Sequence, residues 1–298
     1  MSATRPVIVA WRLLSGAASE KGKEAAVTRS LIEQVLAAAG PQAIGLRLSD
    51  ALYADGPLLA WLKYSKGIDA LVSLPEDRLL YQDVQGLAQA QLIDWTHHRY
   101  LRTVQGHKQV REVEVTAVGE LTSWEGFTEA AATYGVRDAS LWTCLIRDVT
   151  TAESAAEPPR ALVSTRAFRD GFAALQAFRP RWHIEDDTYG ELKEGWGLEK
   201  QRWGRDLAAA VGRTTLTCLA FNTAQVYRLQ AGQRLASVAI RRLRRLRQRQ
   251  LGAAPAVIYA AGCYGVFALE ELLSLLGTPT RESLLPALSK TSSSDAPT

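Results

Sequence analysis

The chain has few of the residues from which soft metal sites and disulfide frameworks are built. Its 298 residues include only three cysteines and four histidines. Cys144, Cys218 and Cys263 are odd in number and far apart, which argues against a zinc site and favours a reducing compartment. Three of the histidines fall within residues 97–107, so we expect no histidine-rich metal cluster either.

Common motifs for phosphate binding and nucleophilic catalysis are also missing. The sequence contains no Gly-rich phosphate loop, no G-x-S-x-G elbow and no internal repeat. A nucleotide-binding or serine-hydrolase function therefore has no support from a motif. Residues 1–49 contain no Asp, and their acidic residues are Glu20, Glu24 and Glu33.

One uncharged stretch approaches the length of a membrane span. Residues 252–269 read GAAPAVIYAAGCYGVFAL, and a bilayer core requires about 20 apolar residues. Glycines and a proline interrupt the stretch, which divides into PAVIYAAG and CYGVFALEELLSLLG. We predict a buried strand followed by a helix, with no membrane partner. Because Met1 leads into polar residues, we also expect no signal peptide and a cytoplasmic location.

The composition that remains is ordinary for a globular protein. Hydrophobic residues make up 47% and charged residues 22%, with a formal net charge of +4 and a pI of about 9.0. The length allows one or two domains with a sizeable core. The mildly basic balance is compatible with a polyanionic partner.

The first part of the chain alternates strand and helix patterns. Three short apolar runs predict buried strands: residues 6–13, 42–50 and 68–75. Between them, residues 19–40 and 55–67 have amphipathic patterns that end in glycine, which predicts two helices. This β-α-β-α-β order is typical of a mostly parallel sheet covered by helices.

The pattern changes between about residues 95 and 165. Short alternating runs such as REVEVTAVGEL, SLWTCLIRDV and PRALVST are separated by polar, turn-rich segments. Alternation with a period of two predicts antiparallel strands, which we interpret as an inserted β-rich subdomain. From there to about residue 250 the chain has helical patterns.

Two carboxylates stand out by their positions. Asp50 ends an apolar strand, where a carboxylate caps a helix, closes a turn or holds a metal. Glu185 lies in a predicted helix within residues 178–203, on the same face as Arg181. The alternative for residues 178–203 is an exposed helix without a functional site, stabilised by Arg–Glu pairs. Asp55, directly before GPLLAWL, is better explained as a helix N-cap.

The two segments resemble the catalytic motifs of DDE transposases of bacterial insertion sequences, in the insertion-sequence-4 type group. That family surrounds its third catalytic carboxylate with the pattern Tyr-x2-Arg-x3-Glu-x6-Lys. Arg181 and Glu185 match this spacing, Phe178 stands at the Tyr position, and Lys193 follows one residue late. LRLSDALYADGPLLAWLK resembles the family's second catalytic strand, which makes Asp50 the second carboxylate.

The resemblance implies an α/β fold with a ribonuclease-H-like mixed sheet and flanking helices, interrupted by a β-rich insertion. The implied domains are 1–92 (first part of the catalytic domain), 93–165 (the insertion), 166–276 (the helical remainder and C-terminal region) and 277–298 (a disordered tail). Asp50 and Glu185 would hold Mg²⁺ or Mn²⁺ for DNA cleavage and strand transfer, and Arg181 and Lys193 would contact DNA.

The family's first catalytic Asp has no counterpart in residues 1–49. We therefore expect the chain to be the carboxy-terminal part of a transposase, without its first strands and inactive on its own. In a less favoured alternative, Glu20 or Glu24 replaces the Asp and the enzyme is active. In another, the chain is a non-catalytic remnant that binds DNA and dimerises with itself or with a full-length transposase.

The densest basic run is IRRLRRLRQRQ, residues 240–250. We predict that its arginines contact the phosphates of double-stranded DNA at transposon ends, in a protein associated with the bacterial nucleoid. The arginines are Arg241, Arg242, Arg244 and Arg245. The alternative is a solvated helix face, since Leu243 and Leu246 have a spacing suited to packing.

Overall fold

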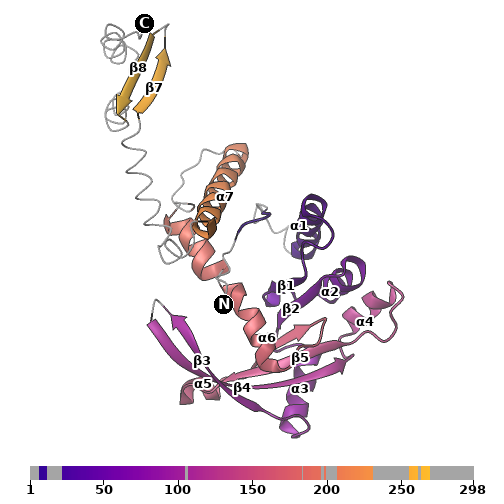
Figure 1. The fold of residues 1–298 in the computed structure, drawn as a ribbon. Helices are drawn as coiled ribbons and strands as arrows, with labels where there is room; N and C mark the ends of the chain where they lie inside the picture. Colours follow the sequence, from indigo (N-terminus) through magenta and orange to yellow (C-terminus); the bar gives the residue numbers. More distant parts are fainter. Residues whose placement is uncertain are drawn as a thin grey trace. The chain divides into compact units, whose positions relative to one another are not determined.

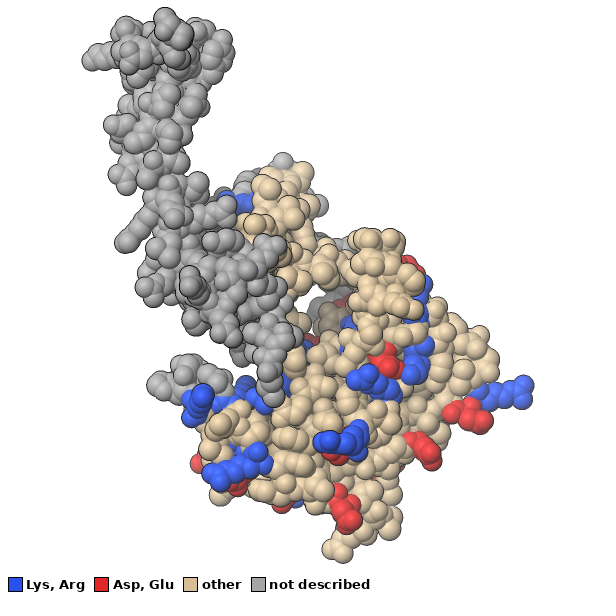
Figure 2. All heavy atoms as spheres, in the orientation of Figure 1, with Lys and Arg blue, Asp and Glu red and all other residues tan. Residues whose placement is uncertain are grey.

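The computed structural model of the protein describes residues 7–11, 22–104, 107–182, 184–195, 198, 207–230, 255–260 and 263–268. The chain forms two compact units. One is Pro6–Tyr189, and the other combines Met1–Arg5 with Gly190–Thr298. Figure 2 shows basic and acidic side chains interspersed over the described surface, as the small net charge of +4 leads one to expect.

The unit Pro6–Tyr189 is built on a six-stranded mixed sheet with the order β1-β2-β6-β5-β4-β3 (Figure 1). The strands are β1 (Leu46–Ser49), β2 (Asp69–Leu74), β3 (Thr96–Val104), β4 (His107–Leu121), β5 (Leu141–Asp148) and β6 (Arg160–Ser164). β1 pairs in parallel with β2, and all the other neighbours are antiparallel. The expected α/β class is confirmed as a mixed sheet with flanking helices.

Helices connect and cover these strands. They are α1 (Glu24–Ala39), α2 (Gly56–Ala60), α3 (Leu79–Gln89), α4 (Glu125–Ala132), α5 (Ala152–Ala156) and α6 (Gly171–Phe178). Two 3₁₀ turns, η2 (Ala51–Tyr53) and η4 (Arg179–Arg181), and two π-helices, η3 (Trp61–Ser65) and η5 (Ile184–Tyr189), complete this unit. The helices predicted over 19–40 and 55–67 are thus present as α1 and as α2 with η3.

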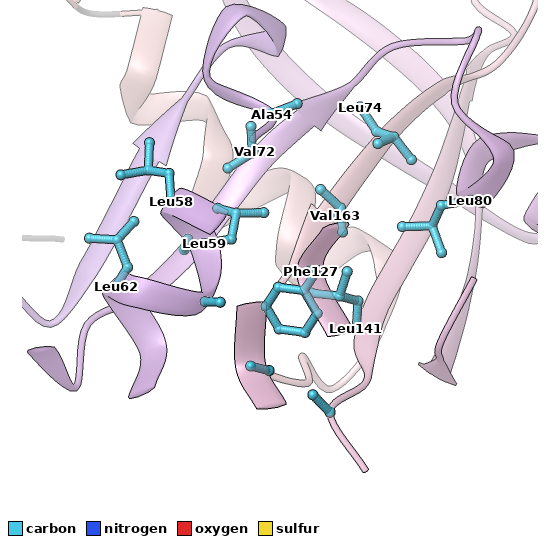
Figure 3. Packing of buried hydrophobic residues seen from close by; sticks show 14 of the residues in the cluster. Ala54, Leu58, Leu59, Leu62, Val72, Leu74, Leu80, Phe127, Leu141 and Val163 are labelled. Carbon is cyan, nitrogen blue, oxygen red and sulfur yellow. The ribbon is translucent and has the colours of Figure 1, made fainter. Parts of the chain in front are cut away.

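The larger hydrophobic core lies between one face of the sheet and the helices α1 to α4. Leu58, Leu59 and Leu62 of α2 and η3 have no exposed surface, and Phe127 of α4 packs in the same cluster (Figure 3). Each such side chain stabilises the fold by roughly 1.5–3 kcal/mol relative to an exposed one. This core fixes the segment that follows β1.

Helix α6 covers the opposite face of the sheet. Its Ala174 and Phe178 pack against Leu71, Trp142 and Cys144 of the strands. In β2, Leu71 belongs to this cluster whereas its neighbours belong to the larger core, as the two-residue period of a strand requires. The unit therefore has a helix–sheet–helix arrangement.

The second unit contains η6 (Glu191–Gly195), α7 (Leu207–Gln230) and an antiparallel hairpin of β7 (Pro255–Ala260) and β8 (Cys263–Ala268). The strand predicted for PAVIYAAG is confirmed as β7. The helix predicted to follow it is wrong over residues 263–268, because CYGVFA pairs back onto β7 across a two-residue connection.

The first predicted strand is also wrong where it can be compared. Residues 7–11 of the apolar run 6–13 have no regular secondary structure, and residues 12 and 13 lie outside the described part. In contrast, the strands predicted between 111 and 165 are present as β4, β5 and β6. They extend the sheet that β1 and β2 begin.

Two other expectations fall on residues that the structure does not describe. These are the basic run 240–250 and the tail 277–298. Within the described ranges, no helix is long and apolar enough to cross a membrane.

Candidate functional site

Asp50 lies at the carboxyl end of the parallel pair β1–β2. The last paired residue of β1 is Ser49, opposite Val72, and Asp50 follows it directly. Its backbone is extended (φ −78°, ψ −177°), and it precedes the 3₁₀ turn η2 without capping it through its side chain. Ligands of open α/β sheets bind outside the carboxyl ends of parallel strands, which is where this carboxylate stands.

The helix-capping role is taken by Asp55. Its Oδ1 accepts a hydrogen bond of 2.7 Å from the backbone N–H of Leu58, which begins α2 with Pro57 in its first turn. The sequence-based prediction of this N-cap is therefore confirmed. Asp50, five residues earlier, is left without that structural task.

Polar atoms without partners gather at the end of β1. Oδ1 of Asp50 is buried and has no hydrogen-bond partner among the described residues, and the same holds for Oγ of Ser49. Burying such an atom unpaired costs about 1–3 kcal/mol, and more if it is charged. A ligand that contacts these two oxygen atoms would remove that cost.

Arg47 contributes a third such atom from the same strand. Its Nη1 is buried and finds no hydrogen-bond partner within the described part of the chain, and its guanidinium lies 4.9 Å from the ring centre of Tyr53. Burial lowers the pKa of Arg47, while Tyr53 and Asp50 act in the opposite direction. The side chain is thus a desolvated cation in the neighbourhood of the Asp50 carboxylate.

Two further segments reach this end of β1. Burial raises the pKa of Tyr53, and the charge of Asp50 raises it further. Arg47 lowers this pKa, whereas Tyr189 and Glu24 raise it by smaller amounts. Tyr189 is the last residue of η5, and Glu24 is the first of α1. Tyr189 of η5 and Glu24 of α1 therefore both lie in the neighbourhood of Tyr53.

The backbone around Glu185 differs from the predicted α-helix. Residues Arg179–Arg181 form a 3₁₀ turn and Ile184–Tyr189 a π-helix. Pro180 donates no backbone hydrogen bond, so it interrupts the regular ladder after α6. The predicted common face of Arg181 and Glu185 assumed a regular α-helix; it stays a prediction, because the side chain of Glu185 lies outside the described part.

The other sequence-predicted residues are only partly brought together. Glu185 lies in η5, but its side chain is outside the described part. The Arg181 guanidinium lies 5.4 Å from the ring centre of Phe178, within the same unit as Asp50. Lys193 lies in η6, which belongs to the other unit, and its side chain is exposed. Arg241, Arg242, Arg244 and Arg245 are not described.

Sequence reasoning missed Arg47, Ser49 and Tyr53. A signal for Arg47 was present, because a cation within the apolar run LRLS sits in a strand that is largely enclosed. Ser49 and Tyr53 carry no such signal, since serine and tyrosine are common at strand ends and in turns.

A hard cation suits part of this site. A buried, unpaired carboxylate oxygen is the kind of ligand that Mg²⁺ or Mn²⁺ takes. No group of three His, Cys, Asp or Glu side chains converges among the residues that the structure describes. A metal centre at Asp50 therefore requires Glu185 or another acid in addition.

Comparison with known proteins does not assign the chain to a family. No protein-family model matches it, and no curated protein matches it in sequence. An interpretation of the site must therefore rest on its own residues.

Proposed function

We propose that the chain is part of a DDE-type transposase and that Asp50 and Glu185 hold Mg²⁺ or Mn²⁺ during cleavage and transfer of DNA strands. The observation that carries the proposal is the buried, unpartnered Oδ1 of Asp50 at the carboxyl end of a parallel strand pair. Such ions, when bound, polarise the phosphodiester and lower the pKa of an attacking hydroxyl.

Three further features support this proposal. The nearness of Tyr53 and Tyr189 supports an approach of η5, which contains Glu185, to Asp50. π-Helical turns are rare and are frequent at functional sites. Arg181, in the turn just before η5, offers a guanidinium for bidentate binding of a phosphate near the scissile bond.

The proposal leaves open which residue supplies the third acid of such a site. Residues 1–49 offer glutamates but no Asp, and Glu24 is the one whose charge acts on Tyr53. If Glu24 takes part, the chain carries a complete set of three acids. If it does not, the chain supplies two acids and cannot cut DNA by itself.

Metal binding to the full chain tests the proposal directly. Titration with Mn²⁺, followed by electron paramagnetic resonance, compares the wild type with Asp50→Asn, Glu185→Gln and Glu24→Gln. We expect the first two variants to weaken Mn²⁺ binding about tenfold or more, and Glu24→Gln to do so only if it is the third ligand. Asp55→Asn is the matched control, because Asp55 caps α2 and should leave Mn²⁺ affinity unchanged.

The alternative is a non-catalytic protein that binds DNA and dimerises. It is favoured by the lack of a three-acid group among the described residues. Wild-type protein that binds no Mn²⁺ but retains DNA affinity in the Asp50→Asn, Glu185→Gln double variant would support this alternative and sink the metal centre.

A further inference from the structure

Arginines and aromatic rings alternate where β3 meets the turn η4. The guanidinium of Arg102 lies 4.5 Å from the ring centre of Trp182, and that of Arg179 lies 4.6 Å from the ring centre of Tyr100. We call these four residues the arginine–aromatic surface. Arg181, stacked on Phe178, belongs to the same turn.

The surface is held by rigid elements. Tyr100 and Arg102 are two residues apart in β3, so they share one face of the strand. Arg179 donates hydrogen bonds to the carbonyl of Leu101 (3.4 Å) and to Oε1 of Gln176 (3.2 Å), which ties η4 to the strand. Because both guanidinium groups are stacked and that of Arg179 is also hydrogen-bonded, less conformational entropy remains to be lost on binding.

The described acids near this surface pair with other arginines. Nearby acids are occupied by other arginines: Glu112 by Arg99, Asp148 by Arg111, and Glu114 by Arg147. Among the residues that the structure describes, no carboxylate lies within ion-pair distance of Arg102 or Arg179.

We propose that the arginine–aromatic surface binds the phosphodiester backbone of double-stranded DNA through Arg102 and Arg179. A guanidinium stacked on a ring directs its N–H groups outward in its own plane, where they can donate to a phosphate. In Arg179, Nη1 and Nη2 already donate to Gln176 and Leu101, so its remaining N–H groups would make this contact. A guanidinium covers one face of Tyr100 and one face of Trp182, which leaves less of each ring for stacking unpaired bases than a single-strand site would use. The inference deepens the proposed function and rests on it for the identity of the partner.

The experiment measures binding of a fluorescein-labelled DNA duplex to the full chain by fluorescence anisotropy, in EDTA, between about 50 and 200 mM salt. Each phosphate contact that is lost should reduce the slope of log affinity against log salt by about 1, so Arg102→Gln with Arg179→Gln should reduce it by about 2. Arg102→Lys keeps the charge and should restore most of the slope at that position.

Arg99→Gln is the matched control. Arg99 lies in the same strand but on the opposite face, is 68% exposed and pairs with Glu112 at 3.6 Å. We expect its salt slope and affinity to equal those of the wild type. An equal loss from Arg99→Gln and from the double variant would overturn the proposal, because general charge would then explain binding.

Two other outcomes also count against the surface. Unchanged duplex binding by the double variant, with the same thermal unfolding as the wild type, removes the two arginines from the interface. Tighter binding of single-stranded DNA or of heparin than of duplex shows that the partner class is wrong. Because EDTA removes any metal, loss of duplex binding in the double variant supports the surface even if the Mn²⁺ experiment refutes the metal centre.

Discussion

At the residue scale, the end of β1 combines unpaired polar atoms with enclosure by other segments. Arg47, Ser49 and Asp50 each bury an atom that has no hydrogen-bond partner. Selection for stability alone would pair or remove such atoms, because each lowers the free energy of unfolding. A ligand that forms hydrogen bonds with them would explain why they are present. In contrast, Asp55 nearby has a complete structural role as an N-cap.

Gly56 provides a strict test of packing at one residue. A Cβ atom built there would lie 2.6 Å from the backbone C of Gly126 and from N of Phe127. Backbone cannot move aside as a flexible side chain does, so Gly56→Ala should lower the free energy of unfolding by about 2–3 kcal/mol. Urea denaturation followed by circular dichroism measures the change.

Gly86 is the matched control for that substitution. It lies inside α3 and is exposed, and a Cβ there meets nothing within 4 Å. Because alanine favours the helix, Gly86→Ala should raise the free energy of unfolding by about 0.5–1 kcal/mol. Equal effects of both substitutions would show that α2 and α4 are not in close contact.

Cys144 allows a prediction about thiol reactivity. Burial raises the pKa of Cys144 to about 12, although a backbone hydrogen bond at Leu162 acts against this. The reactive thiolate is therefore absent near pH 8, and the side chain has no exposed surface. In a Cys218→Ser, Cys263→Ser background, a thiol-specific reagent should label the protein only after denaturation. Rapid labelling of the folded protein would contradict this placement in the core.

At the element scale, α6 depends on its cap. Asp170 accepts a 2.6 Å hydrogen bond from the backbone N–H of Ala173, and this bond, followed by Arg169, holds the pKa of Asp170 below its usual range despite some burial. Asp170→Ala should lower the free energy of unfolding by about 1 kcal/mol at neutral pH. Thermal or urea unfolding measures the loss.

The same cap predicts a pH dependence. A lowered pKa in the folded state means that the stabilisation is fully present above the unfolded pKa of about 3.9 and is lost as pH falls through the folded value. The difference between wild type and Asp170→Ala should therefore shrink in acid below about pH 4. Asp138→Ala, at an exposed position, is the control and should have no effect at either pH. A difference that persists unchanged in acid would exclude a carboxylate cap.

Local pattern was sufficient for several elements. Amphipathic spacing predicts α1, the Asp55 cap predicts the start of α2, and an apolar run predicts β1. Each of these signals depends mainly on residues that are neighbours in the sequence. Residues 7–11 did not form the predicted strand, because apolar composition alone does not specify strand pairing. CYGVFA failed because its pairing with β7 outweighed a helical pattern that continues beyond it.

The candidate sites divide in the same way. Asp50 could be predicted because a carboxylate at the end of an apolar strand is a local signal. The π-helix around Glu185 could not, since it inserts a residue into a turn without altering composition. The meeting of Arg102 with Trp182 depends on where an edge strand and a turn after Pro180 come together, which no local pattern encodes.

At the scale of the whole molecule, the division into two compact units predicts how the protein unfolds. Pro6–Tyr189 has its own core, and in the other unit Phe221 of α7 is fully buried. Compact units of one chain commonly unfold as separate cooperative transitions. Differential scanning calorimetry of the full chain should resolve two transitions, and Gly56→Ala should shift only one. A single transition that moves as a whole would show that the units unfold together.

The close approach at Gly56 also limits how this sequence can change over evolutionary time. Any side chain at position 56 pushes α2 away from α4, and α2 begins one residue after the Asp55 cap and six residues after Asp50. Substitution of an exposed glycine such as Gly86 meets no neighbouring atom, whereas any side chain at position 56 meets the backbone of residues 126 and 127. Related sequences that retain a functional acid at position 50 should therefore also retain the glycine at position 56.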